Sequence, residues 1–300
     1  MAVPEMKCVI PAAGYGTRFL PATKAIPKEL IPLIDKPVAQ HVLEEARAAG
    51  LLRALMVVGR HKQAIADHFD RSIELEQHLI REGKESALEQ IRACSELAEI
   101  HYVRQGEERG VGHAVLCART YVGDQPFAVL LPDEIIDRRA RLLERMTAVQ
   151  RRAGGSVVAL TEVDPSEIHL YGCAQVEPTG EKDVVRITGL VEKPGAGDAP
   201  SNLAVVGRFV LDPGVFAELE RTPPGHGGEL QLTDALHAMA RQDSGGGPVH
   251  GVIVPGGRHD TGHREGHLRA TVELAWSHEE IGPRFRSWLR AFVADAPGDD

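Results

Sequence analysis

The chain of 300 residues contains few aromatic residues and few cysteines. Trp, Tyr and Phe together make up 4% of the sequence, and the four cysteines are Cys8, Cys94, Cys117 and Cys173. These cysteines lie far apart and lack the short spacing of zinc ligands or of a small disulfide scaffold. We therefore expect buried, reduced thiols, which are typical of a cytoplasmic protein.

Long apolar runs and an excess of positive charge are also missing. No segment approaches the roughly 18 consecutive apolar residues of a membrane-spanning helix, and the first residues do not resemble a secretion signal. The formal net charge of −9 argues against nucleic acid as a partner, because proteins that bind it present broad basic surfaces. We expect no membrane and no nucleic-acid partner, although local cations can still bind a small anion.

Apolar residues make up 43% of the chain, which is enough for a sizeable core. In the first half, short apolar runs alternate with amphipathic segments. The expected strands span residues 7–12, 54–58, 100–103 and 127–131, and the expected helices span residues 38–49, 61–69, 72–82, 86–93, 112–118 and 141–152. Such alternation predicts a Rossmann-like α/β fold, with a mainly parallel, mixed sheet between flanking helices.

The second half contains more strands than helices until its last 40 or so residues. The expected strands span residues 157–161, 172–177, 184–192, 203–211 and 249–254, and the expected helices span residues 215–220, 232–241, 267–278 and 283–294. We expect this half to complete the same α/β domain. The last two helices are expected to cover the domain or to contact another subunit.

A glycine-rich and basic segment follows the first strand. Residues 14–18 read Gly-Tyr-Gly-Thr-Arg, and the cations Arg18, Lys24, Lys28 and Lys36 are spread over a proline-rich stretch. Glycines let backbone N–H groups approach a ligand closely, and spaced cations can bind several phosphates together. The segment is neither a Walker A sequence nor a complete dinucleotide fingerprint. It favours a polyphosphate ligand over the alternative, a solvated basic loop.

A second glycine-containing motif begins at Gln105, which is followed by Gly110, Gly112 and His113 at the start of an expected helix. An amide side chain both donates and accepts hydrogen bonds, which suits the imide edge of a pyrimidine. The alternative is a turn with a helix-capping glycine. His113 is more typical of a structural hydrogen bond than of a catalytic base.

Acidic residues follow several expected strands. Asp133 comes after the strand at 127–131, and Asp260 comes after the strand at 249–254. Carboxylates at this edge of a parallel sheet lie near the crevice where ligands bind, and oxygen ligands suit Mg²⁺. Elsewhere, Glu192 is suited to sugar hydroxyls and Lys193 to a phosphate. The alternatives are a helix cap for Asp133 and a surface ion pair for Glu192 and Lys193.

Taken together, these segments resemble the bacterial UTP–glucose-1-phosphate uridylyltransferases, a family of sugar-1-phosphate nucleotidyltransferases. The resemblance extends over residues 7–262. It is carried by the motifs Gly-x-Gly-Thr-Arg-x-Leu-Pro-Ala-Thr-Lys-Ala-Ile-Pro-Lys-Glu (14–29), Gln-Gly-x-x-x-Gly-x-Gly-His-Ala-Val-Leu-Cys-Ala (105–118), Leu-Pro-Asp (131–133), Val-Glu-Lys-Pro (191–194), Pro-Ser-Asn-Leu-Ala-x-Val-Gly-Arg (200–208) and Glu-Leu-Gln-Leu-Thr-Asp (229–234).

The resemblance implies a single in-line displacement, in which α-D-glucose 1-phosphate attacks the α-phosphorus of UTP and gives UDP-glucose and pyrophosphate. It implies Mg²⁺ as the cofactor, held by Asp133 and Asp260, and catalytic roles for Arg18, Lys28, Asp133 and Lys193. The nucleotide contacts that it implies are Ala13, Gly14, Gly16, Thr17, Gln105 and Gly110. The sugar-phosphate contacts that it implies are Gly172, Glu192, Lys193, Val206 and Arg264.

The resemblance also divides the chain into a nucleotide-binding half (1–155), a sugar-binding half of the same domain (156–262) and a helical segment (263–300) that would form a homodimer or homotetramer. This segment departs from the family, which usually has Asn or Asp, Lys, Leu, Gly and an aromatic residue where 263–267 read His-Arg-Glu-Gly-His.

Two other functions stay open. A thymidylyltransferase that uses dTTP is one, because a pocket distinguishes one methyl group by only about 1–3 kcal/mol. A catalytically weak regulator that binds a nucleotide sugar is the other, and the altered 263–267 segment is the reason to consider it.

Overall fold

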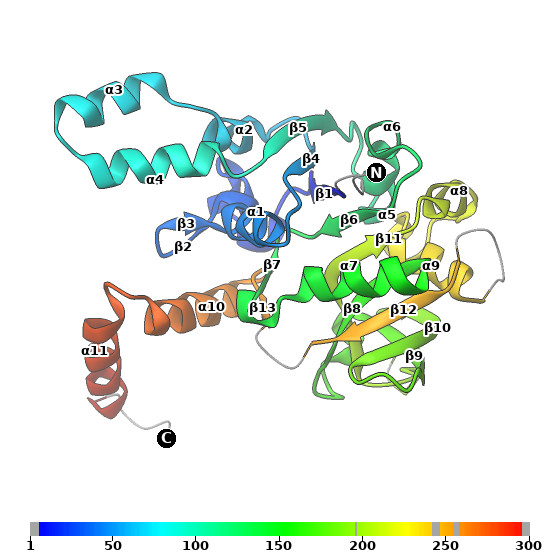
Figure 1. The fold of residues 1–300 in the computed structure, drawn as a ribbon. Coiled ribbons are helices and arrows are strands. Elements are labelled where there is room, and N and C mark those ends of the chain that lie inside the picture. The colour runs from blue at the N-terminus through cyan, green and yellow to red at the C-terminus, as the bar shows by residue number, and fades with distance from the viewer. Residues whose placement is uncertain (1–5, 196, 242–246, 255–257, 296–300) are drawn as a thin grey trace.

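The fold is built on one nine-stranded sheet, which runs through both expected halves of the chain (Figure 1). The computed structural model describes residues 6–195, 197–241, 247–254 and 258–295, so the ends of the expected segments 1–155 and 263–300 lie outside the described residues. In sheet order, the strands are β5 (Glu99–Arg104), β4 (Arg53–Val58), β1 (Lys7–Ala12), β6 (Phe127–Leu130), β11 (Leu203–Leu211), β8 (Ser156–Glu162), β12 (Val249–Ile253), β10 (Val184–Glu192) and β9 (Gly172–Pro178).

The direction of the strands changes in the middle of the sheet. Strands β5, β4, β1 and β6 are parallel neighbours, as the alternating pattern of the first half predicts. Strand β11 runs antiparallel to both β6 and β8, and β10 runs antiparallel to β12 and β9, whereas β8 and β12 are parallel. The predicted α/β class with a mixed sheet is confirmed.

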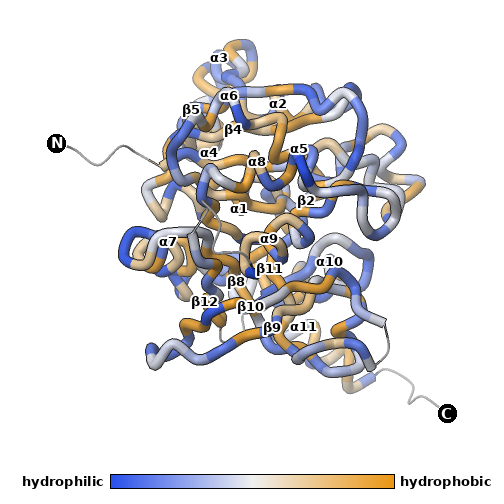
Figure 2. The backbone as a smooth tube through the Cα atoms, turned by 90° about the vertical axis from the view of Figure 1, so that its right-hand side faces the viewer, coloured by the Kyte–Doolittle hydropathy of each residue, from blue (hydrophilic) through white to orange (hydrophobic). Residues whose placement is uncertain are grey.

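Both faces of the sheet are covered, because successive side chains of each strand point to opposite sides. Along β1, Cys8 and Ile10 belong to one buried cluster, and Val9 belongs to the other. The helices α1 (Val38–Ala48) and α7 (Leu142–Ala153) cover the first face. The helices α5 (Val111–Cys117), α8 (Gly214–Arg221) and α9 (Leu232–Arg241) cover the second. Hydrophobic residues accordingly dominate the central strands, and hydrophilic ones dominate many outer loops (Figure 2).

Two pairs of consecutive helices extend from this body (Figure 1). One consists of α3 (Ile73–Arg81) and α4 (Glu85–Ser95), which are joined by an ion pair between Glu76 of α3 and Arg92 of α4. The other consists of α10 (Arg264–Ser277) and α11 (Gly282–Asp295), so the expected C-terminal helices are present. The remaining α-helices are α2 (Gln63–Phe69) and α6 (Arg119–Val122). Within the described residues, none of the helices has the length and apolar character to span a membrane.

Several short elements shape the ligand-binding side, and sequence patterns did not predict them. Strand β7 (Glu134–Ile136) pairs with β13 (Arg258–Asp260), and β2 (Pro32–Leu33) pairs with β3 (Lys36–Pro37). The 3-10 helices are η1 (Thr17–Phe19), η2 (Ala22–Lys24), η3 (Lys28–Leu30), η4 (Arg138–Ala140), η5 (Ile168–Leu170) and η6 (His226–Gly228). Elements of two or three residues are too short to show a hydrophobic period.

One buried arginine ties the middle of the sheet to the edge where the site lies. Arg208 of β11 is fully buried, and its Nη2 atom lies 2.7 Å from Oε2 of Glu45 in α1. The same guanidinium donates to the carbonyl oxygens of Leu131, at 3.0 Å, and of Glu134, at 2.8 Å. These two carbonyls stand on either side of Asp133, so Arg208 fixes the turn between β6 and β7.

We predict that Arg208→Met lowers the free energy of unfolding by about 3–5 kcal/mol, because it leaves the Glu45 carboxylate buried without its partner. Urea denaturation measures this change. The matched control is Arg152→Met, which breaks an exposed pair with Glu181 and should cost about 0–1 kcal/mol. Equal stabilities of the two variants would contradict the role given to Arg208.

Candidate active site

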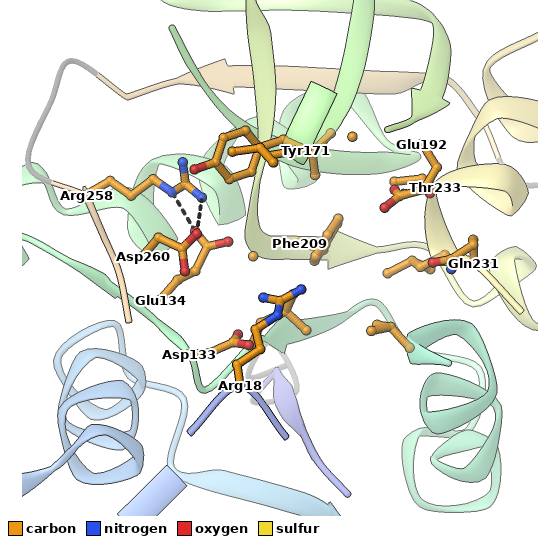
Figure 3. A pocket seen from close by; sticks show the side chains of 17 residues that line it. Arg18, Asp133, Glu134, Tyr171, Glu192, Phe209, Gln231, Thr233, Arg258 and Asp260 are labelled. Atoms are coloured by element: carbon orange, nitrogen blue, oxygen red, sulfur yellow. Dashed lines mark hydrogen bonds and ion pairs between the residues drawn. The ribbon is translucent and has the colours of Figure 1, made fainter. Parts of the chain in front are cut away.

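Two adjoining cavities open at the carboxyl ends of the parallel strands. The first cavity lies between the glycine loop after β1 and the start of α5, and its lining includes Ala13, Gly14, Lys28, Gln105 and Gly110. The second cavity lies between the β6–β7 turn and the strands of the second half (Figure 3). Val111, Leu131 and Asp133 line both cavities, so the two share a wall and one carboxylate.

The first cavity depends on a close approach of two backbone segments. Gly110 has φ +93°, and a β-carbon there would lie 2.8 Å from the carbonyl oxygen of Leu230. The Gly112 amide donates to the same oxygen at 2.9 Å. Gln105 turns its side-chain amide nitrogen toward the Gly110 carbonyl, at 3.2 Å, and the His113 ring, at 3.0 Å. Its carbonyl oxygen is therefore the atom suited to a ligand's donor.

Glu29 is a residue of the first cavity that sequence reasoning missed. Its side chain is buried, and Oε2 accepts a hydrogen bond from Lys62 at 2.8 Å. Oε1 is also buried and has no hydrogen-bond partner among the described residues. Because an unpaired buried acceptor is costly, Glu29 is suited to a hydroxyl or N–H group of a ligand. The sequence feature that could have revealed Glu29 is an acidic residue directly after Lys28 in an otherwise basic loop.

Lys28 and Asp133 form an ion pair at the shared wall, with 2.8 Å between Nζ and Oδ2. Burial acts to raise the pKa of Asp133, but the Lys28 ammonium outweighs it and holds this pKa below its usual value. Burial likewise acts to lower the pKa of Lys28, and Asp133, followed by Glu29, raises it above its usual value. Both groups are therefore charged at neutral pH.

Asp133 and Asp260 come together although 127 positions separate them. Antiparallel pairing places Asp260 opposite Glu134, and the backbone amide and hydroxyl of Thr261 both donate to the Asp133 carbonyl at 2.8 Å. A β-carbon on Gly262 would lie 3.0 Å from Oδ1 of Asp260 and 3.3 Å from Oδ2 of Asp133. The two carboxylates therefore flank one point.

This pair of carboxylates fits a hard divalent cation. Such ions take oxygen ligands, and Mg²⁺ in particular uses one or two carboxylates and completes its coordination with water and substrate phosphates. Among the residues that the structure describes, no group of three or more His, Cys, Asp or Glu side chains forms a complete metal site. An ion between Asp133 and Asp260 would thus be bound jointly with a ligand.

The second cavity has acidic and basic walls (Figure 3). On one side, Glu192 accepts a hydrogen bond from Thr233 at 2.8 Å, and Gly172 packs so closely that a β-carbon would lie 3.2 Å from the Glu192 carboxylate. On the other side, Arg258 donates to Glu134 at 2.9 Å and stacks over the Tyr171 ring at 4.6 Å. Sequence reasoning missed Arg258, which stands in β13 beside Asp260.

Arg18 reaches the second cavity from below in the view of Figure 3. The loop that presents it contains Gly16, with φ +67°, where a β-carbon would lie 3.0 Å from the Lys28 β-carbon. Thr17 begins the short helix η1. Gly16 and Thr17 support the loop and are not among the cavity-lining residues in the described part of the chain.

Three predicted sugar-phosphate residues are not among the described residues that line the two cavities. The Val206 side chain is fully buried in the core, because alternation along β11 turns its neighbours Val205 and Gly207 toward the cavity instead. Lys193 follows β10 with φ +45° and is not among the described lining residues. The Arg264 guanidinium donates to backbone carbonyls of the Arg18 loop, so it is outside both cavities.

The fold and these cavities define a nucleotidyltransferase. Residues 7–274 match the nucleotidyl transferase family, and the chain belongs to that family. It is 44% identical over 276 residues to UTP–glucose-1-phosphate uridylyltransferase 2 of Staphylococcus saprophyticus, covering 92% of this chain and 93% of the relative. The resemblance read from the sequence motifs is therefore confirmed.

Solved structures of similar proteins support the same family assignment. A UTP-bound UGPase from Acinetobacter baumannii is 35% identical with a TM-score of 0.87, and the match covers 95% of this chain and 98% of that one. A UDP-glucose pyrophosphorylase complexed with UDP-glucose is 41% identical with a TM-score of 0.80, and the match covers 89% of this chain and 97% of that one.

We predict that ionisation of Asp133, which stabilises the native fold, destabilises the fold of the Lys28→Met variant. In the native protein the pKa of Asp133 is lowered on folding, so its contribution is present above the unfolded pKa of about 3.9 and is lost as the pH falls. Without the ammonium, burial raises that pKa, and ionisation of Asp133 then destabilises the fold. The stability difference between native protein and variant should grow from pH 4 to pH 7 in urea denaturation. A difference independent of pH would contradict this coupling.

Proposed function

We propose that this enzyme transfers the uridylyl group of UTP to α-D-glucose 1-phosphate, with UDP-glucose and pyrophosphate as products. The observation that carries the proposal is the meeting of Asp133 and Asp260 beside Lys28, at the wall shared by the two cavities. The similarity to enzymes with this name and to UTP-bound and UDP-glucose-bound structures supports it.

The first cavity is proposed to hold uridine. Ala13 and Gly14 offer backbone groups at the end of β1, and Gln105 and Gly110 form the opposite side. Uracil has one N–H donor and two carbonyl acceptors on its outer edge, which suits an amide side chain between backbone groups. Gly16 and Thr17 are proposed to act on the triphosphate through the turn that they form.

The second cavity is proposed to hold the sugar phosphate. Glu192 presents a carboxylate that can accept sugar hydroxyls, and Gly172 provides room beside it. Lys193, at the end of the same strand, is proposed to contact the phosphate. Val206 can contribute only backbone groups, since its side chain is in the core.

Charge and position are sufficient for the reaction. The sugar phosphate is ionised at neutral pH and acts as the nucleophile, so no nucleophilic side chain is needed. As the bond to the leaving group breaks, negative charge moves onto pyrophosphate, where Arg18 and Lys28 can stabilise it. We propose Mg²⁺ as the cofactor, with Asp133 and Asp260 as its ligands; when bound it supplies positive charge to phosphate oxygens.

The terminal helices and the cysteines support two further proposals. Apolar side chains of α10 and α11 are exposed, including Trp288 at 56% and Phe292 at 58%, which favours a homodimer or homotetramer through this segment. Cys8, Cys94 and Cys173 are buried free thiols, which suits the reducing cytoplasm.

A pyrophosphate-release assay with UTP or dTTP, several sugar 1-phosphates and variable Mg²⁺ tests the proposed function. We expect Mg²⁺-dependent release that is fastest with UTP and glucose 1-phosphate. We expect Asp133→Asn and Lys28→Ala to lower kcat on the order of 10²- to 10³-fold with the fold intact, because each removes a charge that acts in the transition state.

The matched controls are Asp124→Asn and Lys84→Ala, which change exposed residues away from the cavities and should leave turnover unchanged. Faster turnover with dTTP would favour the thymidylyltransferase instead. Binding of UDP-glucose without pyrophosphate release would favour the regulator. Near-native turnover of Asp133→Asn or Lys28→Ala would remove that residue from the mechanism.

A further inference from the structure

The first turn of α10 forms hydrogen bonds to the loop that presents Arg18. Arg264 donates from Nε to the Arg18 carbonyl at 3.0 Å and from Nη2 to the Leu20 carbonyl at 2.9 Å. One turn further along, the His267 ring packs edge-on against the Phe19 ring, with 5.8 Å between centroids. Three consecutive residues of the loop are therefore held by two side chains at the start of α10.

The same turn is joined tightly to Asp260. The Gly262 amide donates to Oδ1 of Asp260 at 2.9 Å. A β-carbon on Gly266 would lie only 1.9 Å from the Asp260 carbonyl oxygen, so the helix start rests directly on the backbone of β13. His263 caps the helix by accepting from the Gly266 amide at 3.1 Å. The position of the Arg18 loop is thus tied to the strand that carries one of the two central carboxylates.

We propose that Arg264 is a positioning residue, which fixes the Arg18 loop against β13 so that the Arg18 side chain lines the second cavity. This inference rests on the proposed function, because the position of Arg18 matters for activity only if Arg18 acts on the phosphates. Two diverging N–H groups match two carbonyls that are two residues apart. A lysine ammonium at this position is a single point charge and cannot reproduce that fork.

His267 assists through its shape and not through its charge. Burial lowers the pKa of its imidazole, so the ring is neutral at pH 7 when it packs on Phe19. The Arg264 contacts, in contrast, are charge-assisted hydrogen bonds to carbonyls, which are stronger than neutral ones. Arg264 is accordingly the residue to test.

A double-mutant cycle on kcat/KM tests the proposal. Because Arg264 acts through Arg18, we expect Arg264→Met to lower kcat/KM about 10- to 100-fold in the native background and to have almost no effect in an Arg18→Met background. Arg264→Lys should recover part of the loss. The control is Arg269→Met in the same helix, where an exposed pair with Glu265 is lost and kcat/KM should not change.

Hydrogen exchange gives a readout that does not depend on activity. The Phe19 and Leu20 amides donate to Gly16 and Thr17 carbonyls within the loop. Both amides should exchange faster in Arg264→Met than in the native protein or in Arg269→Met, while thermal unfolding stays cooperative. If Arg264→Met does not fold, the same comparison is made with Arg264→Lys.

The outcomes separate this inference from the proposed function. If Arg18→Met is as active as the native protein, the role of Arg18 in the proposed function is wrong. If Arg18→Met is impaired but the two substitutions are additive, or if loop exchange does not change, Arg264 is not a positioning residue for Arg18 and only this inference fails.

Discussion

The pairing of β13 with β7 is the constraint on which the site depends. Each strand has only three residues, and together they bring Asp260 beside Asp133 from the far end of the chain. Two carboxylates at one place repel each other, so the arrangement needs nearby positive charge. Lys28 supplies it at Asp133, and Arg258 lies between Glu134 and Asp260, 2.9 Å and 3.9 Å from their carboxylates. The site thus joins three carboxylates and two cationic side chains, and its excess of negative charge favours a cation.

Behind this charged group, the sheet supplies rigidity. Arg208 holds the carbonyls on both sides of Asp133 from a fully buried position in β11, the strand that joins the parallel half to the mixed half. Because β11 is antiparallel to β6, the first residues of β11 lie beside the carboxyl end of β6, where the cavities open. Val205 and Gly207 of β11 therefore also line the second cavity. One strand therefore positions the Asp133 carboxylate and shapes the proposed sugar site, which links the stability of the fold to the geometry of both.

Sequence patterns predicted the elements with a strong hydrophobic period and missed those without one. The bounds of β1, β10, β11 and α9 match the expectation fully, since the strands are apolar runs with Gly or Pro nearby and the helix has a clear amphipathic period. The strands β7 and β13 are too short to be recognised from sequence and owe their conformation to tertiary pairing. The family resemblance implied that Asp133 and Asp260, which lie in distant segments, would meet, and the structure brings them together.

The direction in which a side chain points was harder to predict from sequence than the strand or helix that carries it. Strand β11 is buried on both faces, so apolar residues in a row do not show which face Val206 takes, and its register shifts between Val206 and Phe209. The family resemblance implied Arg264 as a sugar-phosphate contact, whereas in the structure its guanidinium forms hydrogen bonds to a backbone loop. Glu29 was overlooked because the sequence alone does not show that its partner is Lys62, which lies 33 positions further along the chain.

The segment 263–267 shows how a departure from a family pattern can still preserve geometry. His263 replaces the usual short polar residue and caps α10, and His267 replaces an aromatic residue and still packs on Phe19. Gly266 is retained where no β-carbon fits. These contacts argue against loss of activity as the meaning of the altered segment, and they favour a working enzyme over a binding-only regulator.

Anomalous diffraction from crystals grown with Mn²⁺ and UTP tests the central claim most directly. The account predicts one manganese peak that lies about 2.1 Å from a carboxylate oxygen of Asp133 and equally close to one of Asp260, with phosphate oxygens completing its coordination. A peak that contacts only one of these aspartates, or that lies on the nucleotide away from both, would contradict it.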